Sequence, residues 1–176
     1  ISQQITDQFW LGFGISAPFG LANEYDDNWF GRYDATKTEL TTIDMAPSMA
    51  YKVNDWLSVG GSVILQYAEA ELKNNVFGTT QGTQTLDGDD LSLGWKAGFI
   101  AEPMQGTRLG FDYRSEITHK LEGRLLLENT GAAALTADIV GNADLNLPDI
   151  ATFSVAHDVN DKLTLLGSAT YFSWAD

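Results

Sequence analysis

The chain has no cysteine, only four prolines, few cations and no long apolar run. Without cysteine, a disulfide framework, a thiolate nucleophile and a Cys-based zinc site are all excluded. The longest apolar run is far shorter than the about 20 residues that a transmembrane helix needs. Ten Lys and Arg stand against 24 Asp and Glu, which leaves a net charge of −14. This charge argues against nucleic acid as a partner, because such binding depends on cations that neutralise phosphates.

What the chain does have is strict alternation, which is clearest over residues 107–124. Side chains of a strand point to opposite faces in turn. The odd positions are mostly apolar: Leu109, Phe111, Tyr113, Ser115, Ile117, His119 and Leu121. The even positions are mostly charged: Arg108, Gly110, Asp112, Arg114, Glu116, Thr118, Lys120, Glu122 and Arg124. Such a strand is much longer than the about 5–6 residues usual in globular proteins, and its two faces suit a membrane β-barrel with a wet lumen.

Neighbouring segments show the same alternation. Segments 37–53 and 56–72 flank the turn Asn54-Asp55. Each segment has one apolar face, and this face becomes charged at the end of the segment far from the turn. The apolar part covers about ten residues, which is what a tilted strand needs to cross the hydrocarbon core. We therefore expect the polar extensions to stand outside the bilayer.

The pattern predicts an all-β protein, an antiparallel up-and-down meander of about seven strands. These strands are expected over residues 8–17, 37–53, 56–72, 90–102, 107–127, 147–158 and 162–174. Short turns at Asn54-Asp55, 103–106 and Asn160-Asp161 alternate with long polar connections over 18–37, 73–89 and 128–146. Bacterial outer-membrane barrels have this asymmetry. A soluble β-sandwich or lipocalin would also alternate, but strand length and loop asymmetry favour the membrane barrel.

An odd number of strands points to a larger barrel. Bacterial single-chain barrels have even numbers of strands, and an open sheet edge is not tolerated in lipid. No signal peptide is visible, although such barrels are exported. We therefore expect residues 1–176 to be a single partial barrel domain from a longer protein.

Several motifs resemble the FadL/TodX family of outer-membrane transporters of hydrophobic compounds. They lie at residues 16–33 (SAPFGLANEYDDNWFGRY), 40–55 (LTTIDMAPSMAYKVND), 111–123 (FDYRSEITHKLEG), 144–148 (DLNLP), 159–167 (VNDKLTLLG) and 171–174 (YFSW). The resemblance covers nearly the whole chain. It implies about strands three to nine of a fourteen-stranded barrel, with the N-terminal hatch and the last strands absent. It also implies passive uptake of long-chain fatty acids or aromatic hydrocarbons across the bacterial outer membrane, by a monomeric barrel in contact with lipid and lipopolysaccharide.

The resemblance places a lateral gate, formed by a kink in a strand, at Ser16, Ala17, Pro18, Phe19 and Gly20. The residues suit this role chemically, because Pro18 cannot donate a ladder hydrogen bond and Gly20 permits unusual backbone angles. The simpler alternative is that this stretch only ends a strand and enters a loop.

The resemblance also places a substrate groove on the connections 73–89 and 128–146. Candidate apolar contacts there are Val76, Phe77, Leu86, Leu135, Ile139 and Val140. Candidate polar residues of the lumen are Lys73, Asn74, Arg108 and Arg114. Asn74 stands where fatty-acid-importing relatives have a cation, which leaves neutral hydrocarbons open as substrates. Arg114 is the residue that could hold a carboxylate with two hydrogen bonds.

Other polar groups carry no chemistry that we can assemble. The charges of segment 108–122 are expected to compensate one another along the lumen wall. His119 and His157 stand alone, with no metal spacing and no catalytic triad, so neither an enzyme nor a metal or cofactor site is predicted. The acidic runs Asp26-Asp27 and 87–90 lack the full ligand register of a calcium loop and are interpreted as solvated turns. The alternative to transport is a structural or adhesive barrel whose loops bind a partner.

Overall fold

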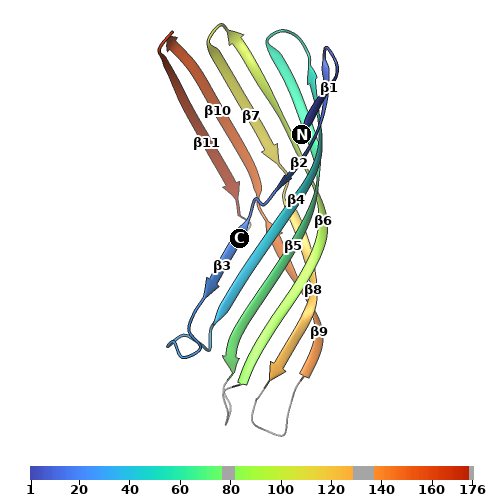
Figure 1. Cartoon of the computed structure of the whole chain (residues 1–176), viewed down its shortest axis with the longest axis vertical. Coiled ribbons are helices and arrows are strands. Elements are labelled where there is room, and N and C mark those ends of the chain that lie inside the picture. The colour runs from blue at the N-terminus through green and yellow to red at the C-terminus, as the bar shows by residue number, and fades with distance from the viewer. Residues whose placement is uncertain (77–81, 129–136, 175–176) are drawn as a thin grey trace.

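The computed structural model describes residues 1–76, 82–128 and 137–174. It contains eleven antiparallel strands in one sheet. The strands are β1 (Ser2–Thr6), β2 (Phe9–Ser16), β3 (Gly20–Glu24), β4 (Lys37–Lys52), β5 (Leu57–Val76), β6 (Gly82–Met104), β7 (Thr107–Arg114), β8 (Ile117–Glu128), β9 (Ala137–Leu147), β10 (Asp149–Asn160) and β11 (Leu163–Ser173). The sheet is an up-and-down meander, as predicted, and it curves into an open trough (Figure 1).

Several of the strands are halves of one longer span. β3 continues β2 along β4, β8 continues β7 along β6, and β9 runs on into β10. The predicted strands all exist in this sense, and β1 is an additional strand paired with β2. β1 was missed because its sequence, Ser2-Gln3-Gln4-Ile5-Thr6, has little apolar character to alternate.

The short turns lie at one end of the sheet, and the longer connections lie at the other end (Figure 1). In the turn after β4, the side-chain oxygen of Asn54 accepts hydrogen bonds from the backbone N–H groups of Trp56 and Leu57. In the turn after β6, Gly106 has a φ of 77°, a conformation that favours glycine. These local interactions explain why the predicted turn positions are confirmed.

Of the predicted long connections, 18–37 contains the short strand β3 and a connection over 25–36, whereas 73–89 and 128–146 are wrong, because most of their described residues are strand. β5 continues to Val76, β6 begins at Gly82, and β8 and β9 extend to Glu128 and from Ala137. The polar residues in these stretches do not end the strands. Strands that extend beyond the bilayer can still pair through their backbones while their side chains contact water. The run 87–90 therefore lies within β6 and is not a turn.

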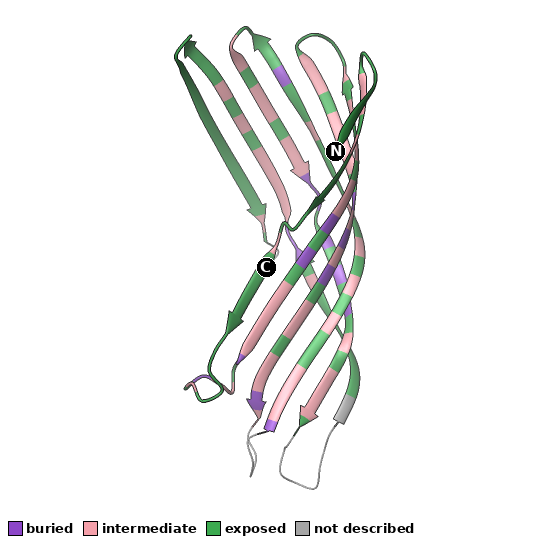
Figure 2. Cartoon of the chain, in the orientation of Figure 1, coloured by how far each residue is buried: buried purple, intermediate pink, exposed green. Residues whose placement is uncertain are grey.

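Each strand has an inner face on the concave side of the trough and an outer face on the convex side. Val63, Leu65, Trp95 and Phe99 lie on the outer face and are partly or largely exposed. The inner face carries the buried residues Ile64, Gln66 and Ala68 of β5. Figure 2 shows that buried residues gather at mid-height on β4 and β5.

The single alternation predicted for 107–124 is also wrong. Residue Arg114 pairs with Lys96, and Glu122 pairs with Asp89, so seven residues (115–121) face six (90–95). The extra residue is a bulge, which reverses the facing of the chain. As a result Arg114 and His119 both reach the inner face, although one number is even and the other is odd.

Candidate functional site

The span formed by β2 and β3 is interrupted at residues 17–19, which we call the strand break. Ser16 pairs with Asp44 and Gly20 pairs with Thr41, so three residues of one strand face only Thr42 and Ile43 of β4. Pro18 lies in the middle of this stretch and has no N–H to donate. The ladder between the two spans is therefore broken at the position where the family resemblance predicts the lateral gate.

Thr42 holds the strand break in one geometry. Its hydroxyl donates to the Phe19 carbonyl oxygen over 2.8 Å and accepts from the Phe19 N–H over 3.1 Å. The Thr42 N–H also donates to the same carbonyl over 3.2 Å. Thr42 is completely buried. Phe19 is thus fixed to β4 by its backbone, whereas Pro18 beside it is exposed.

The ring of Phe19 lies against two residues from distant parts of the chain. The ring of Trp174, which follows β11, meets it edge-on at a centroid distance of 6.3 Å. The guanidinium carbon of Arg114 lies 5.8 Å from the Phe19 ring centre. Because Arg114 faces inward, the Phe19 ring belongs to the inner side of the trough.

Beside Phe19 lies a chain of polar side chains, which we call the polar network. It consists of Arg114, Asp44, Gln66, His119, Asp90 and Ser92. Arg114 donates two hydrogen bonds to Asp44, at 2.5 and 3.3 Å. Gln66 donates to Asp44 over 2.5 Å, and its carbonyl oxygen lies 3.0 Å from His119 Nε2. His119 Nδ1 lies 2.9 Å from Asp90, which also accepts from Ser92 over 2.6 Å.

The hydrogen-bonding capacities of these groups determine the orientation of the Gln66 amide. Asp44 accepts from Arg114, so the Gln66 group facing it must be the NH₂ group, and the Gln66 carbonyl must face His119. Gln66 therefore links Asp44 to His119 Nε2, and the other ring nitrogen of His119, Nδ1, faces the Asp90 carboxyl group. The polar network thus joins the Arg114 guanidinium, the His119 ring and the carboxyl groups of Asp44 and Asp90 through the Gln66 amide.

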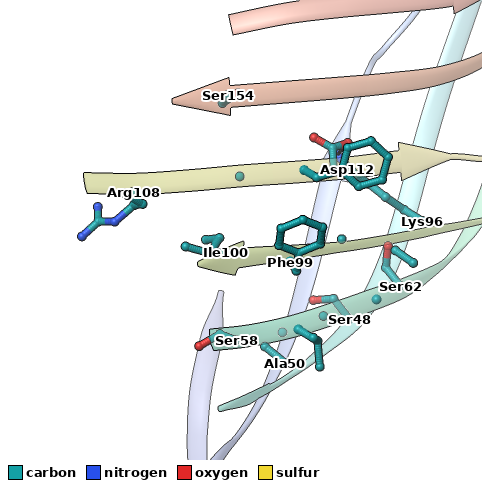
Figure 3. Close-up of a pocket in the computed structure, with 18 of the residues that line it drawn as sticks. Ser48, Ala50, Ser58, Ser62, Lys96, Phe99, Ile100, Arg108, Asp112 and Ser154 are labelled. Atoms are coloured by element: carbon teal, nitrogen blue, oxygen red, sulfur yellow. Dashed lines mark ion pairs between the residues drawn. The ribbon is translucent and has the colours of Figure 1, made fainter. Parts of the chain in front are cut away.

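Below the polar network, toward the short turns, the inner face is hollow. The hollow has a volume of about 880 Å³, and small residues such as Ser48, Gly60 and Gly98 form much of its wall. Figure 3 shows Lys96 and Asp112 together on this wall, with Arg108 further toward the turns. Lys96 lies 2.9 Å from Asp112, and Arg108 lies 2.8 Å from Glu102.

The predicted groove residues lie on strands rather than on loops. Leu86 of β6 is opposite Leu125 of β8, which is opposite Ile139 of β9, so these three form one row on the inner face. Val140 lies on the other face of β9, and Val76 is the last residue of β5. The positions 77 and 135 (Phe77 and Leu135) lie outside the described residues.

Of the predicted luminal residues, Arg108 and Arg114 lie on the inner face and Lys73 does not. Lys73 shares the outer face with Glu71 and pairs with Lys37 across the strands. Lys37 forms ion pairs with Glu71 at 2.6 Å and with Glu39 at 2.9 Å, and these hydrogen bonds raise its pKa. Asn74 donates to the backbone oxygen of Tyr33 in the connection between β3 and β4.

Sequence reasoning missed most of the polar network. It treated His119 as isolated, because its partners Gln66 and Asp90 are far away in the sequence. The signal that was available was the presence of Asp44 and Gln66 within otherwise small or apolar inner faces. In the part of the chain that the structure describes, no group of three or more His, Cys, Asp or Glu is arranged to hold a metal ion.

The fold and the site together define a section of a transmembrane β-barrel wall, with an apolar outer face, a polar interior and a broken strand. No helix within the described ranges has the length and apolar character for a membrane crossing. The sequence profile of the outer membrane protein transport protein (OMPP1/FadL/TodX) family matches residues 1–176. The chain belongs to this family, and its place is the outer membrane.

Curated relatives agree with this assignment. Outer membrane protein P1 of Haemophilus influenzae is 28% identical over 97% of this chain and 44% of its own length. The long-chain fatty acid transport protein of Escherichia coli O6:H1 is 28% identical over 97% of this chain and 46% of its own. The chain therefore spans less than half the length of these relatives.

Solved structures show the same architecture. A Pseudomonas aeruginosa FadL homologue superimposes with a TM-score of 0.86 at 26% identity, over 98% of this chain and 47% of that one. The Ralstonia pickettii toluene transporter TbuX superimposes with a TM-score of 0.76 at 19% identity, over 95% of this chain and 52% of that one. The second likeness concerns the fold alone.

Proposed function

We propose that the complete protein carries hydrophobic small molecules passively across the outer membrane, and that they leave the barrel sideways at the strand break. The observation that carries the proposal is the extra residue at 17–19, which interrupts the ladder between β2/β3 and β4. A continuous barrel wall has no lateral opening, because its backbone groups are all paired. A proline and an unpaired residue at mid-height provide a position at which the barrel wall can open laterally.

The interior supports the same route. Phe19 and Trp174 present aromatic surface beside the break. On the inner face above them, Leu21 and Leu40 are register partners, and the row through Leu86, Leu125 and Ile139 follows toward the loops. A hydrophobic molecule that enters from the loop side would meet apolar side chains down to the break. Relatives named as transporters of long-chain fatty acids and of toluene handle molecules of this class.

Deletion of Pro18 in the full-length protein tests the proposal. The deletion leaves two residues opposite two, so Ala17 would pair with Ile43 and Phe19 with Thr42 in a continuous register. Uptake of radiolabelled toluene and radiolabelled oleate by cells should then fall sharply, because the restored backbone pairing closes the wall at this site.

The matched control is Pro18→Ala, which changes the same residue but keeps the extra position. It should retain most of the uptake, and both variants should show the heat-modifiable gel mobility of folded barrels. If the deletion variant folds and transports as well as the parent does, lateral exit at the strand break is wrong.

A further inference from the structure

The carboxylate of Asp44 occupies the position that a substrate carboxylate would take on Arg114. Arg114 holds Asp44 through both terminal nitrogens, which is the geometry in which guanidinium binds carboxylates. The side chains are 10% and 3% exposed, so water does not weaken the pair. The Arg114 Nε–H is also buried and has no hydrogen-bond partner, so it is not accessible to a ligand.

The polar network leaves no spare positive charge beside Phe19. Arg114 is balanced by Asp44, and the His119 ring lies 2.9 Å from the Asp90 carboxyl group. Gln66 links the two pairs and holds Asp44 in place. A substrate carboxylate would therefore have to displace Asp44, or remain unpaired in a dehydrated site, and both cost free energy.

The other inward-facing cations of the described strands are paired as well. Lys96 has Asp112, Arg108 has Glu102, and Lys52 has Asp55 at 2.8 Å. Higher on the inner face, toward the loops, the rows through Leu40 and Leu86 are apolar. The inner face of the described strands thus offers apolar contacts, and each of its Lys and Arg side chains is paired with a carboxylate.

From this arrangement we infer that Asp44 is a specificity-determining residue, which makes the passage beside Phe19 selective for uncharged hydrophobic compounds over carboxylates. Specificity of this kind arises when the site penalises the competing ligand. The inference rests on the proposed function and adds the substrate class to it.

The test compares uptake of two radiolabelled probes, toluene and oleate, by the full-length protein in cells that lack other transporters of hydrophobic compounds. The parent should take up toluene well above the rate of cells without the protein and oleate at least about tenfold less efficiently. Asp44→Asn keeps the shape of the side chain and frees the Arg114 charge, so oleate uptake should rise by about tenfold, the effect of a charge-assisted hydrogen-bonded pair. Toluene uptake should change less than about twofold, because an uncharged probe does not use the cation.

Two further variants separate Asp44 from a general effect of charge. Asp112→Asn frees Lys96 in the hollow, away from Phe19, and should not change the preference. Asp44→Asn combined with Arg114→Gln removes the freed cation, and the gain of oleate uptake should disappear. If Asp112→Asn raises oleate uptake as much as Asp44→Asn does, the inference is wrong.

The outcomes also separate the inference from the proposed function. If the parent takes up both probes equally, transport stands and the selectivity inferred from Asp44 falls. If the parent takes up neither probe, transport itself is wrong. If Asp44→Asn does not fold, the preference of the parent still decides the matter, because equal uptake contradicts the inference and selective uptake of toluene supports it.

Discussion

The hydroxyl of Thr42 replaces a stretch of regular ladder at the strand break. It satisfies both backbone groups of Phe19 at the point where Pro18 has removed a donor. Buried backbone groups are almost always paired, so a break in a membrane strand needs such a substitute. Threonine fits because its hydroxyl both donates and accepts.

Thr42→Val should destabilise the full-length protein by about 1–3 kcal/mol, since it keeps the shape of the side chain and leaves the Phe19 N–H without its partner. Thr41→Val is the control, because Thr41 is the exposed neighbour on the other face of β4, and it should cost less than about 0.5 kcal/mol. Urea unfolding titrations in lipid vesicles measure both. Equal free energies for the two variants would show that the Thr42 hydroxyl does not support the break.

Some residues of the candidate site could be identified from the sequence, and others could not. Pro18 and Gly20 were recognisable, because their backbone chemistry is local. Asp44, Gln66 and His119 could not be brought together, because their contacts depend on the register of three strands and on the bulge after Arg114. A shift of one residue reverses the facing of every side chain beyond it. A bulge that is not predicted therefore assigns the following side chains to the wrong face of the sheet.

At the scale of the strand, small residues allow β8 to cross close to β6. A Cβ atom added to Gly123 would overlap the backbone carbonyl of Asp87 on β6. Its register partner Gly141 on β9 has open space around the same position, with no described atom within 4 Å. The two glycines therefore form a matched pair within one hairpin.

Gly123→Ala should destabilise the protein by about 1–3 kcal/mol, because the backbone of β6 must shift to admit the methyl group. Gly141→Ala should be close to neutral or slightly stabilising, since alanine loses less conformational freedom than glycine on folding. Thermal unfolding of the two variants in the same detergent measures the difference. A lower Tm for Gly141→Ala than for Gly123→Ala would contradict the placement of β8 against β6.

The ends of the strands were predicted correctly where a turn motif or the bilayer boundary determines them. The turn at Asn54 has its own side-chain hydrogen bonds, and the apolar faces before and after it mark the bilayer. The outer ends of β5, β6, β8 and β9 were not predicted, because glycine and acidic residues such as those at 87–90 are typical of loops in water. In the structure these residues are held by pairing with long neighbours, which a single segment does not reveal.

At the scale of the whole molecule, the sheet separates two environments, and this separation explains why the sequence was informative. The outer face must match hydrocarbon over about ten residues and then water or lipid headgroups. The inner face is free to carry serine, glycine, buried ion pairs and the polar network. Selection for two different solvents leaves a clear alternation in the sequence, even where the strands are longer than expected.

This separation predicts unequal penalties for the same substitution at two neighbouring residues of β5. Val63 lies on the outer face opposite Trp95 and is 55% exposed, whereas Ser62 lies on the wall of the hollow. Val63→Arg in the full-length protein should cost about 2–4 kcal/mol, the penalty for arginine near the bilayer midplane. Ser62→Arg should cost much less, because Ser62 faces the hollow and the lumen is wet. Folding titrations in lipid vesicles measure both values, and equal penalties would mean that the concave side of this sheet is not the lumen.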